Sequence, residues 1–205
     1  RMGDFYETFL EDAVIAAKIL GIVLTKRSNG KASNVDLAGF PYHSLDTYLP
    51  KLVKAGHRVA ICEQVEDPKK AIGIVKREVV EVVTPGTLMS DQTLNNKSNR
   101  YIGNFYIVKN NVGYAFLDSS TGEFSIGECD VQYLKNAILK YLPQEIILSE
   151  KIVYSNLDWY REYKPFITQI DEWMYDYKMA YRELIEHFDV QSLKGFGCED
   201  LNLGI

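Results

Sequence analysis

The chain has 205 residues, a formal net charge of −5, and 46% hydrophobic and 25% charged residues, which is the balance of an ordinary core-forming protein. No apolar run approaches the roughly 20 residues that span a bilayer, and no segment resembles a signal peptide, so we expect a cytoplasmic protein without membrane contact. The three cysteines and three histidines are scattered along the chain, which argues against a disulfide framework or a metal site.

The charge is divided unevenly along the chain. Residues 1–88 hold 12 Lys or Arg and 11 Asp or Glu, a net of +1, whereas residues 89–205 hold 11 and 17, a net of −6. Nucleic-acid binding depends largely on neutralising phosphates with Lys and Arg. Only the first part is therefore expected to lie against DNA, and the second part, left alone, should avoid it.

The first residues allow two interpretations. Gly3-Asp4 is a turn signal between two short apolar-aromatic runs, which indicates a tight hairpin. If residues 5–9 then run extended, Phe5 and Glu7 point to the same face, because strand side chains alternate with period two. Alternatively, Asp4 and Glu7 have the D-x-x-E spacing of a helix capping box, with Phe5 as an ordinary core residue.

The following segments predict a small unit of four or five strands and two helices. The expected helices cover residues 11–20, ended by Gly21, and residues from the N-cap Ser44 to just before Gly56, with Pro50 starting or kinking the second one. The expected strands are residues 22–26, 35–40, 58–65 and 77–83, and a basic loop covers residues 26–34.

A polar stretch separates this unit from a second one. Residues 84–87 (TPGT) break the pattern, and residues 90–100 are Asn-rich and without period. Strands at 101–109, 112–118 and 123–128, with a turn at Asn110-Asn111, then precede a helix at 131–141, a strand at 145–148, an irregular segment at 154–170 and a helix at 172–188. We therefore predict a mixed α/β (α+β) chain with domains at 1–88 and 101–205 and a linker at 89–100.

Seven segments in register resemble the amino-terminal part of the MutS family of DNA mismatch-recognition proteins, over essentially the whole chain. They are RMGDFYE (1–7), LTKR (24–27), AGFPYH (38–43), RVAICEQ (58–64), VVTPGT (82–87), LDSSTGEF (117–124) and LKGFG (193–197). The resemblance implies a small mixed-sheet mismatch-recognition domain followed by a ribonuclease-H-like connector domain, and it favours the extended interpretation of residues 5–9.

The same resemblance implies that the partner is mismatched double-stranded DNA. Phe5 would be an aromatic wedge that enters from the minor groove, and Glu7 would hydrogen-bond the mispaired base. Six positions are expected to contact the DNA backbone: Lys26, Arg27, Lys31, Gly39, Lys76 and Arg77. Tyr6 and Tyr42 are expected to be packing residues, and Glu81 occupies a position where many relatives carry a basic residue.

Catalysis is not expected from this chain. It contains no G-x-x-x-x-G-K-[ST] loop, so we interpret it as a two-domain piece that binds no cofactor, whereas the full-length family protein is an ATPase using ATP and magnesium. The resemblance further implies a MutS homodimer and contact with MutL through the connector domain.

Two alternatives remain open. Asp118, Glu123 and Glu145 lie near strand ends of the expected ribonuclease-H-like sheet, where converging carboxylates would support a metal-dependent structure-specific nuclease. An organellar or nuclear MutS homologue would share the F-x-E signature of Phe5 and Glu7.

Overall fold

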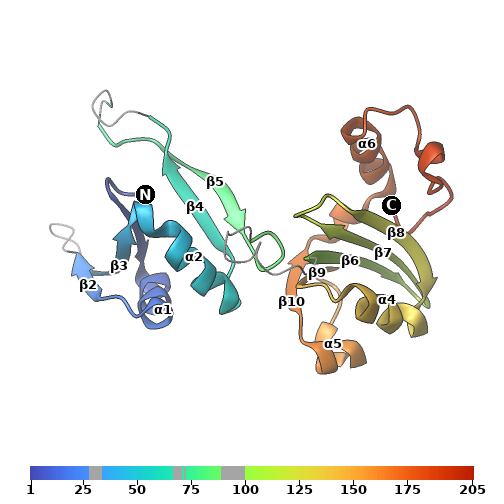
Figure 1. Ribbon diagram of the computed structural model, residues 1–205, viewed down its shortest axis with the longest axis horizontal. Helices are drawn as coiled ribbons and strands as arrows, with labels where there is room; N and C mark the ends of the chain where they lie inside the picture. The colour runs from blue at the N-terminus through green and yellow to red at the C-terminus, as the bar shows by residue number, and fades with distance from the viewer. Residues whose placement is uncertain (28–33, 67–70, 72, 89–99) are drawn as a thin grey trace. The chain divides into compact units, whose positions relative to one another are not determined.

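The computed structural model describes residues 1–27, 34–66, 71, 73–88 and 100–205. Its internal contacts divide the chain into two compact units, unit 1 (Arg1–Asn95) and unit 2 (Asn96–Ile205), which are drawn in blue to green and in green to red in Figure 1. Each unit has hydrophobic core residues of its own. Among the described helices, none combines the length and the apolar character that crossing a membrane requires.

The described residues of unit 1 form five strands and two α-helices, within the four or five strands and two helices that the sequence predicts. They are β1 (Phe5–Phe9), α1 (Leu10–Leu20), β2 (Leu24–Arg27), β3 (Val35–Pro41), α2 (Leu45–Lys54), β4 (Val59–Gln64) and β5 (Arg77–Val83). The mixture of helix and strand is confirmed. The described strands, however, form two antiparallel sheets, β1-β3-β2 and β4-β5, rather than one mixed sheet.

The start of the chain is extended rather than helical. Met2 and Phe5 exchange two backbone hydrogen bonds, of 2.7 and 3.2 Å, around a turn in which Gly3 has a φ of 60° that favours glycine. β1 then pairs with β3, which places Phe5 opposite Pro41 and Glu7 opposite Gly39. The hairpin is therefore present, and the capping-box interpretation is wrong, because the pairing with β3 holds residues 5–9 extended.

Helices α1 and α2 each pack against the core of unit 1 through one face. α1 buries Ala13, Ala16 and Leu20, and it ends at Gly21, as predicted. Ser44 stands at the N-cap position of α2, although its side chain makes no capping hydrogen bond with the described residues. Pro50 lies inside α2 instead of starting it. Since proline lacks an N–H, the helix loses one internal hydrogen bond there.

The β4-β5 hairpin has its own core against α2. Val53 of α2, Ile61 of β4, Val83 of β5 and Leu88 are buried together. Residues 84–87 form a turn in which the backbone N–H of Thr84 donates to the hydroxyl of Thr87 at 2.9 Å. The break that the sequence shows at TPGT is therefore a closed turn, and it returns Leu88 to the core of unit 1.

Unit 2 contains one five-stranded sheet. Its elements are β6 (Tyr101–Val108), β7 (Asn111–Asp118), β8 (Phe124–Asp130), α4 (Leu134–Tyr141), β9 (Glu145–Ser149), α5 (Asp158–Tyr163), β10 (Phe166–Ile170) and α6 (Tyr177–His187). The strand order is β10-β9-β6-β7-β8, with β6, β9 and β10 parallel and the β6-β7-β8 neighbours antiparallel. The three consecutive antiparallel strands, followed by a helix and a further strand, agree with the layout that the sequence predicts.

Three details of unit 2 differ from the sequence prediction. The segment expected to be irregular contains α5 and the strand β10, which pairs with β9. The helix expected at 172–188 is divided into a short 3₁₀ turn (Glu172–Tyr175) and α6. The turn between β6 and β7 lies one residue earlier than predicted, because Val108 pairs with Asn111 and Lys109 takes a φ of 56°.

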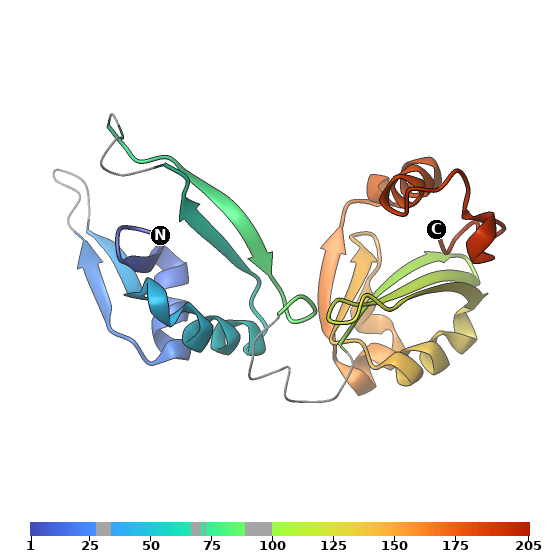
Figure 2. The ribbon, with the colours of Figure 1, turned by 45° about the horizontal axis from the view of Figure 1, so that its top comes forward.

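Helices cover both faces of the sheet of unit 2. α4 and α5 lie on one face and α6 on the other, as both ribbon views show (Figures 1 and 2). The core lies under α4 and α5, where Phe105 and Phe116 are fully buried, with ring centres 5.7 Å apart, and Trp159 of α5 packs edge-on against Phe105. The residues of α6 are half-buried or exposed, so that face is packed less tightly.

Candidate nucleic-acid interface

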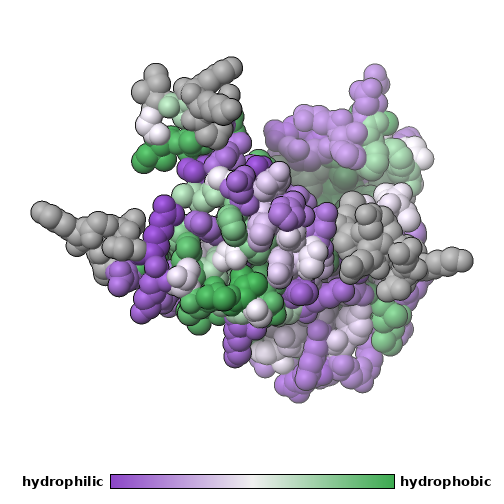
Figure 3. Space-filling model, turned by 60° about the vertical axis from the view of Figure 1, so that its left-hand side comes forward, coloured by the Kyte–Doolittle hydropathy of each residue, from purple (hydrophilic) through white to green (hydrophobic). Residues whose placement is uncertain are grey.

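The three-stranded sheet of unit 1 has one covered face and one open face. Tyr6 packs toward α1 with Phe40, Ala16 and Leu20. Because neighbouring strand residues alternate, Phe5 and Glu7 lie on the other face, which we call the open face. Several hydrophobic residues of β1, α1 and β2 are exposed, and Figure 3 shows a hydrophobic patch (green) bordered by hydrophilic side chains (purple) on the side of the molecule that it brings forward.

Phe5 begins β1, directly after the hairpin turn. Its residue surface is 46% exposed, although phenylalanine is among the residue types most often buried. The backbone around it is fixed: β1 pairs with β3, and the N–H of Tyr42 donates to the carbonyl of Asp4 at 2.9 Å. An exposed ring on a fixed backbone can insert into a partner without first being reorganised.

Glu7 lies on the same face but is far less accessible. Its side chain is 17% exposed, and Nη1 of Arg27 lies 3.5 Å from its Oε2. Oε2 itself is buried and receives no hydrogen bond from the described part of the chain. The guanidinium therefore neutralises the carboxylate by charge without meeting its hydrogen-bonding capacity, so Oε2 keeps its capacity to accept from a ligand.

Gly39 makes room for this arrangement. A Cβ atom at position 39 would lie 2.8 Å from the carbonyl oxygen of Tyr6 and 3.2 Å from Cγ of Glu7. A side chain at this position would thus collide with the backbone of β1. The sequence prediction attributes the small size of Gly39 to a close approach of DNA, and the structure adds a reason within the sheet.

Tyr6 is a packing residue, as predicted. Its ring contacts Phe40, its hydroxyl donates to Glu63, and burial, helped by the hydrogen bond to Glu63 and the charge of that residue, raises its pKa to about 12. Tyr42 is more exposed than a core residue, and the guanidinium carbon of Arg1 lies 4.0 Å from its ring centre. Tyr42 is thus a partly open ring held in a cation–π contact.

The predicted backbone-contacting residues differ in their surroundings. Lys26 and Arg27 are exposed on β2, and Lys31 lies outside the described residues. Lys76 is exposed and lies 2.6 Å from Glu78, whose hydrogen bond raises the pKa of the lysine. Arg77 donates to the backbone carbonyls of Arg1 and Val75 at 2.9 and 2.8 Å, so much of its guanidinium already serves the fold.

Two residues that the sequence analysis did not single out support the site. Arg1 covers Tyr42, and Gln64 accepts a hydrogen bond from the backbone N–H of Gly3 at 3.1 Å. Both lie within the MutS-like segments at 1–7 and 58–64, which was the only signal for them in the sequence. Their contacts hold the hairpin in front of Phe5 against β4.

The acidic residues of unit 2 are held by hydroxyl groups rather than by one another. Ser120 donates to Asp118 through its backbone N–H at 2.9 Å and its hydroxyl at 2.6 Å, Tyr101 donates to Glu123 at 2.8 Å, and Thr168 donates to Glu145 at 2.5 Å. Within the described ranges, no three His, Cys, Asp or Glu side chains converge as metal ligands would. Among the described residues, Asp118, Glu123 and Glu145 thus do not converge as the nuclease alternative requires.

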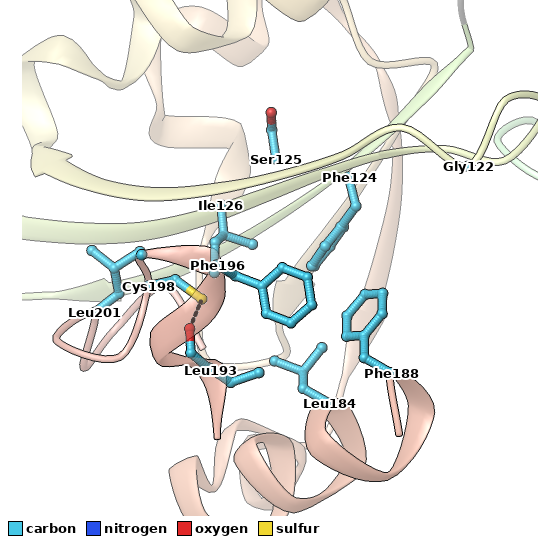
Figure 4. A pocket seen from close by; sticks show the side chains of 11 residues that line it. Gly122, Phe124, Ser125, Ile126, Leu184, Phe188, Leu193, Phe196, Cys198 and Leu201 are labelled. Atoms are coloured by element: carbon cyan, nitrogen blue, oxygen red, sulfur yellow. Dashed lines mark hydrogen bonds between the residues drawn. The ribbon is translucent and has the colours of Figure 1, made fainter. Parts of the chain in front are cut away.

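Unit 2 also has an apolar cavity of 490 Å³ between β8, α6 and the following C-terminal segment. Figure 4 shows the rings of Phe124, Phe188 and Phe196 around it, and the Sγ of Cys198 donates to the carbonyl of Leu193 at 3.7 Å. All three rings are partly exposed, so this is an accessible aromatic surface rather than a closed core.

The two units correspond to two consecutive domains of one family. Residues 1–92 match the family model described as MutS domain I, and residues 100–205 match the one described as MutS domain II. The chain therefore belongs to the MutS family.

Individual relatives agree with this assignment. The chain is 46% identical over 207 residues to the DNA mismatch repair protein MutS of Porphyromonas gingivalis, 47% over 206 residues to that of Cytophaga hutchinsonii, and 48% over 207 residues to that of Flavobacterium psychrophilum. Each alignment covers 100% of this chain and 23 to 24% of the relative. The chain thus spans about a quarter of the length of the curated relatives it matches.

Proposed function

We propose that unit 1 recognises mispaired or unpaired bases in duplex DNA and so initiates mismatch repair, with Phe5 as a minor-groove wedge and Glu7 as the base-contacting residue. The observation that carries the proposal is the open face of the β1-β3-β2 sheet, where the exposed ring of Phe5 and the carboxylate of Glu7 lie on one side of the same strand. The membership in the MutS family and the naming of the relatives support it.

The wedge would select for deformability. Inserting an apolar ring between base steps requires unstacking, which costs a few kcal/mol per step. The cost is lower where pairing is already faulty, so a mispaired site is kinked more readily than an intact duplex. One ring could in this way select many different mismatches without reading each one.

Glu7 would add selection by hydrogen bonding to the selection by deformability that Phe5 provides. A carboxylate near phosphates is repelled by an intact duplex, whereas a displaced base can compensate by donating a ring N–H to it. Lys26, Arg27, Lys31, Gly39, Lys76 and Arg77 would position the duplex through its backbone, which carries no sequence information.

The wedge is tested with two phenylalanines of one strand. Phe5→Ala in the intact protein should lower the preference for a G·T heteroduplex over a homoduplex at least tenfold and spare most non-specific binding, because the phosphate contacts are untouched. Phe9→Ala is the matched control, since Phe9 lies on the same face of β1 and is 39% exposed. The measurement is a titration of both duplexes at matched salt. Wild-type preference in Phe5→Ala would end the wedge assignment.

Glu7→Ala separates recognition from structure in the same titrations. Binding to the homoduplex should hold or rise, because repulsion is relieved and Arg27 loses its partner, while the preference for the heteroduplex falls. Equal weakening of both duplexes would instead show that Glu7 only supports the sheet.

For unit 2 and the longer protein, we propose an interaction role in a MutS homodimer, with MutL as the partner of this unit, as the family resemblance implies. The net charge of −6 over residues 89–205 and the exposed aromatic cavity support contact with protein rather than DNA. ATP and magnesium would be bound outside these two domains. The relatives named above are bacterial, which favours the bacterial form over an organellar or nuclear one.

The cavity offers a test of this role. Phe196→Ser should weaken MutL binding to the intact protein, whereas Tyr133→Ser, which removes another exposed ring of unit 2, should leave it unchanged. Equal binding by both variants would place the partner elsewhere on unit 2. Tight, salt-sensitive DNA binding by residues 101–205 alone would contradict the division of roles.

A further inference from the structure

Arg27 and Glu7 meet across the whole open face of the sheet. Glu7 lies on β1 and Arg27 on β2, with β3 between them, and Nη1 of Arg27 nevertheless reaches to 3.5 Å from Oε2 of Glu7. The register explains how: Glu7 is opposite Gly39, whose missing side chain leaves the surface of β3 free for the carboxylate. Arg27 is opposite Val35 on the same face and reaches along β3 toward it.

The contact covers the acceptor without satisfying it. The side chain of Arg27 is 50% exposed and can be displaced, whereas Oε2 is buried and receives no hydrogen bond from any residue that the structure describes. A buried acceptor without a hydrogen bond is unfavourable, so a ligand that donates one is favoured over the ion pair. A base N–H can reach this oxygen only if the guanidinium moves.

We propose that Arg27 is a specificity-determining positioning residue that exchanges partners during recognition. In the DNA-free protein its guanidinium covers Oε2 of Glu7. A displaced base that donates to Oε2 releases the guanidinium, which then binds a DNA phosphate. An intact duplex offers no such donor, so Arg27 stays on Glu7 and the phosphate contact is not made. The inference rests on the proposed function of Glu7.

This exchange makes the phosphate contact of Arg27, which cannot distinguish bases, depend on the base contact of Glu7, which can. Phosphate contacts normally strengthen binding to every duplex equally. Here the phosphate contact of Arg27 forms only after a base has replaced the guanidinium on Glu7. The gain is therefore added to the heteroduplex alone, and it increases discrimination beyond the hydrogen bond of Glu7 itself.

A double-mutant cycle tests the exchange in the intact protein. Arg27→Met, Glu7→Gln and the double variant are titrated with a homoduplex and a G·T heteroduplex. We expect Arg27→Met to lower the heteroduplex preference about three- to tenfold in the wild-type background and to leave it unchanged in the Glu7→Gln background. The slope of log K against log salt should fall by about one for the heteroduplex only, as for one lost phosphate contact.

Lys26→Met is the matched control. Lys26 is also exposed on β2 and loses the same charge, but strand alternation places its side chain on the opposite face from Glu7. Lys26→Met should change the affinities for the homoduplex and the heteroduplex by the same factor, in the wild-type and in the Glu7→Gln background. Arg27→Lys, which keeps the charge but lacks the planar fork, should retain part of the preference, and it replaces Arg27→Met in the cycle if that variant does not fold.

Two results would overturn the exchange. If Arg27→Met weakened the binding of both duplexes equally, Arg27 would be an ordinary phosphate contact. If Arg27→Met lowered the heteroduplex preference as much in the Glu7→Gln background as in the wild type, Arg27 would act without Glu7. Phe5→Ala, measured alongside, keeps this outcome separate from that of the wedge. Loss of preference in Phe5→Ala without coupling between Arg27 and Glu7 removes the exchange alone.

Discussion

The centre of the sheet in unit 2 and the open face of the sheet in unit 1 hold the same residue types in opposite ways. Phe105 of unit 2 is fully buried beside Phe116, whereas Phe5 of unit 1 is 46% exposed on an open sheet face. Glu145 of unit 2 accepts a hydroxyl hydrogen bond from Thr168, whereas Oε2 of Glu7 faces a guanidinium and accepts no hydrogen bond from the described residues. The difference lies in what each sheet region contacts: the centre of the sheet in unit 2 is enclosed by its own core, whereas the open face of unit 1 leaves Phe5 exposed.

The largest effect is expected from truncating one phenylalanine in each unit. Phe105→Ala should lower the free energy of unfolding of unit 2 by about 3–5 kcal/mol, because it removes a ring from a closed core. Phe5→Ala should change the stability of unit 1 by no more than about 0.5 kcal/mol, as for other exposed positions. Urea unfolding followed by tryptophan fluorescence reports on unit 2 alone, since both tryptophans, Trp159 and Trp173, lie there. Amide hydrogen exchange of β1 and β3 reports on unit 1.

Comparable losses in both variants would break the contrast between the two units. Such a result would mean that Phe5 packs in solution against residues that cover the open face.

A smaller effect is expected at Asp118. Burial tends to raise its pKa, but the hydrogen bonds from Ser120, together with those from the backbone of Arg100 and the side chain of Thr121, outweigh burial and lower it. A carboxylate with a lowered folded-state pKa stabilises the protein above the unfolded value of about 3.9, and this contribution is lost as the pH falls through the folded value. Asp118→Asn should therefore cost about 1–3 kcal/mol at neutral pH, and less as the pH falls below the unfolded value of about 3.9.

Urea midpoints of the tryptophan signal between pH 2 and 7 measure this difference, with the exposed Asp200→Asn as control. An Asp118→Asn penalty that stayed constant over the whole range would show that ionisation of Asp118 contributes nothing to the stability of unit 2.

The smallest effect is expected at Lys76, within unit 1. Lys76→Ala should weaken homoduplex and heteroduplex equally, a few-fold at low salt, because an exposed cation paired with Glu78 adds only a screened phosphate contact. Arg77→Ala should in addition lower the melting temperature of unit 1, since Arg77 donates to the carbonyl of Arg1. Matched titrations and thermal unfolding measure both. If Arg77→Ala left the melting temperature unchanged, the contacts of Arg77 would not stabilise unit 1, and Arg77 would be an ordinary surface cation.

Most of the fold could be predicted from local patterns, and the exceptions have physical reasons. The five residues of β10 follow Lys164 and Pro165 and pair in parallel with β9, so the strand depends on a partner that local sequence does not show. α5 has only six residues, too few for a helical period to be visible. Pro50 was expected to start or kink α2, and it lies inside the helix, where Pro50, Leu52 and Val53 are the buried residues.

The candidate site was predictable only in part. The spacing of Phe5 and Glu7 predicts a shared face once residues 5–9 are extended, but the capping-box pattern fits the same letters. The choice depends on pairing with β3, about 30 residues away. The Arg27 contact depends further on the register of β2 and on the bare surface at Gly39, neither of which has a local signature.

The attachment of the first hairpin would determine how much force Phe5 can bear in the wedge role proposed for it. A ring that holds stacked bases apart is pushed back by the duplex, because bending and unstacking the duplex cost energy that is recovered when it straightens. Several contacts brace the hairpin: Gly3 donates to Gln64 of β4, the carbonyl of Arg1 accepts from Arg77 of β5, and the carbonyl of Asp4 accepts from Tyr42 just after β3. In the proposed wedge role of Phe5, the recoil of the duplex would therefore be shared by both sheets of unit 1, and the hairpin would yield little under it.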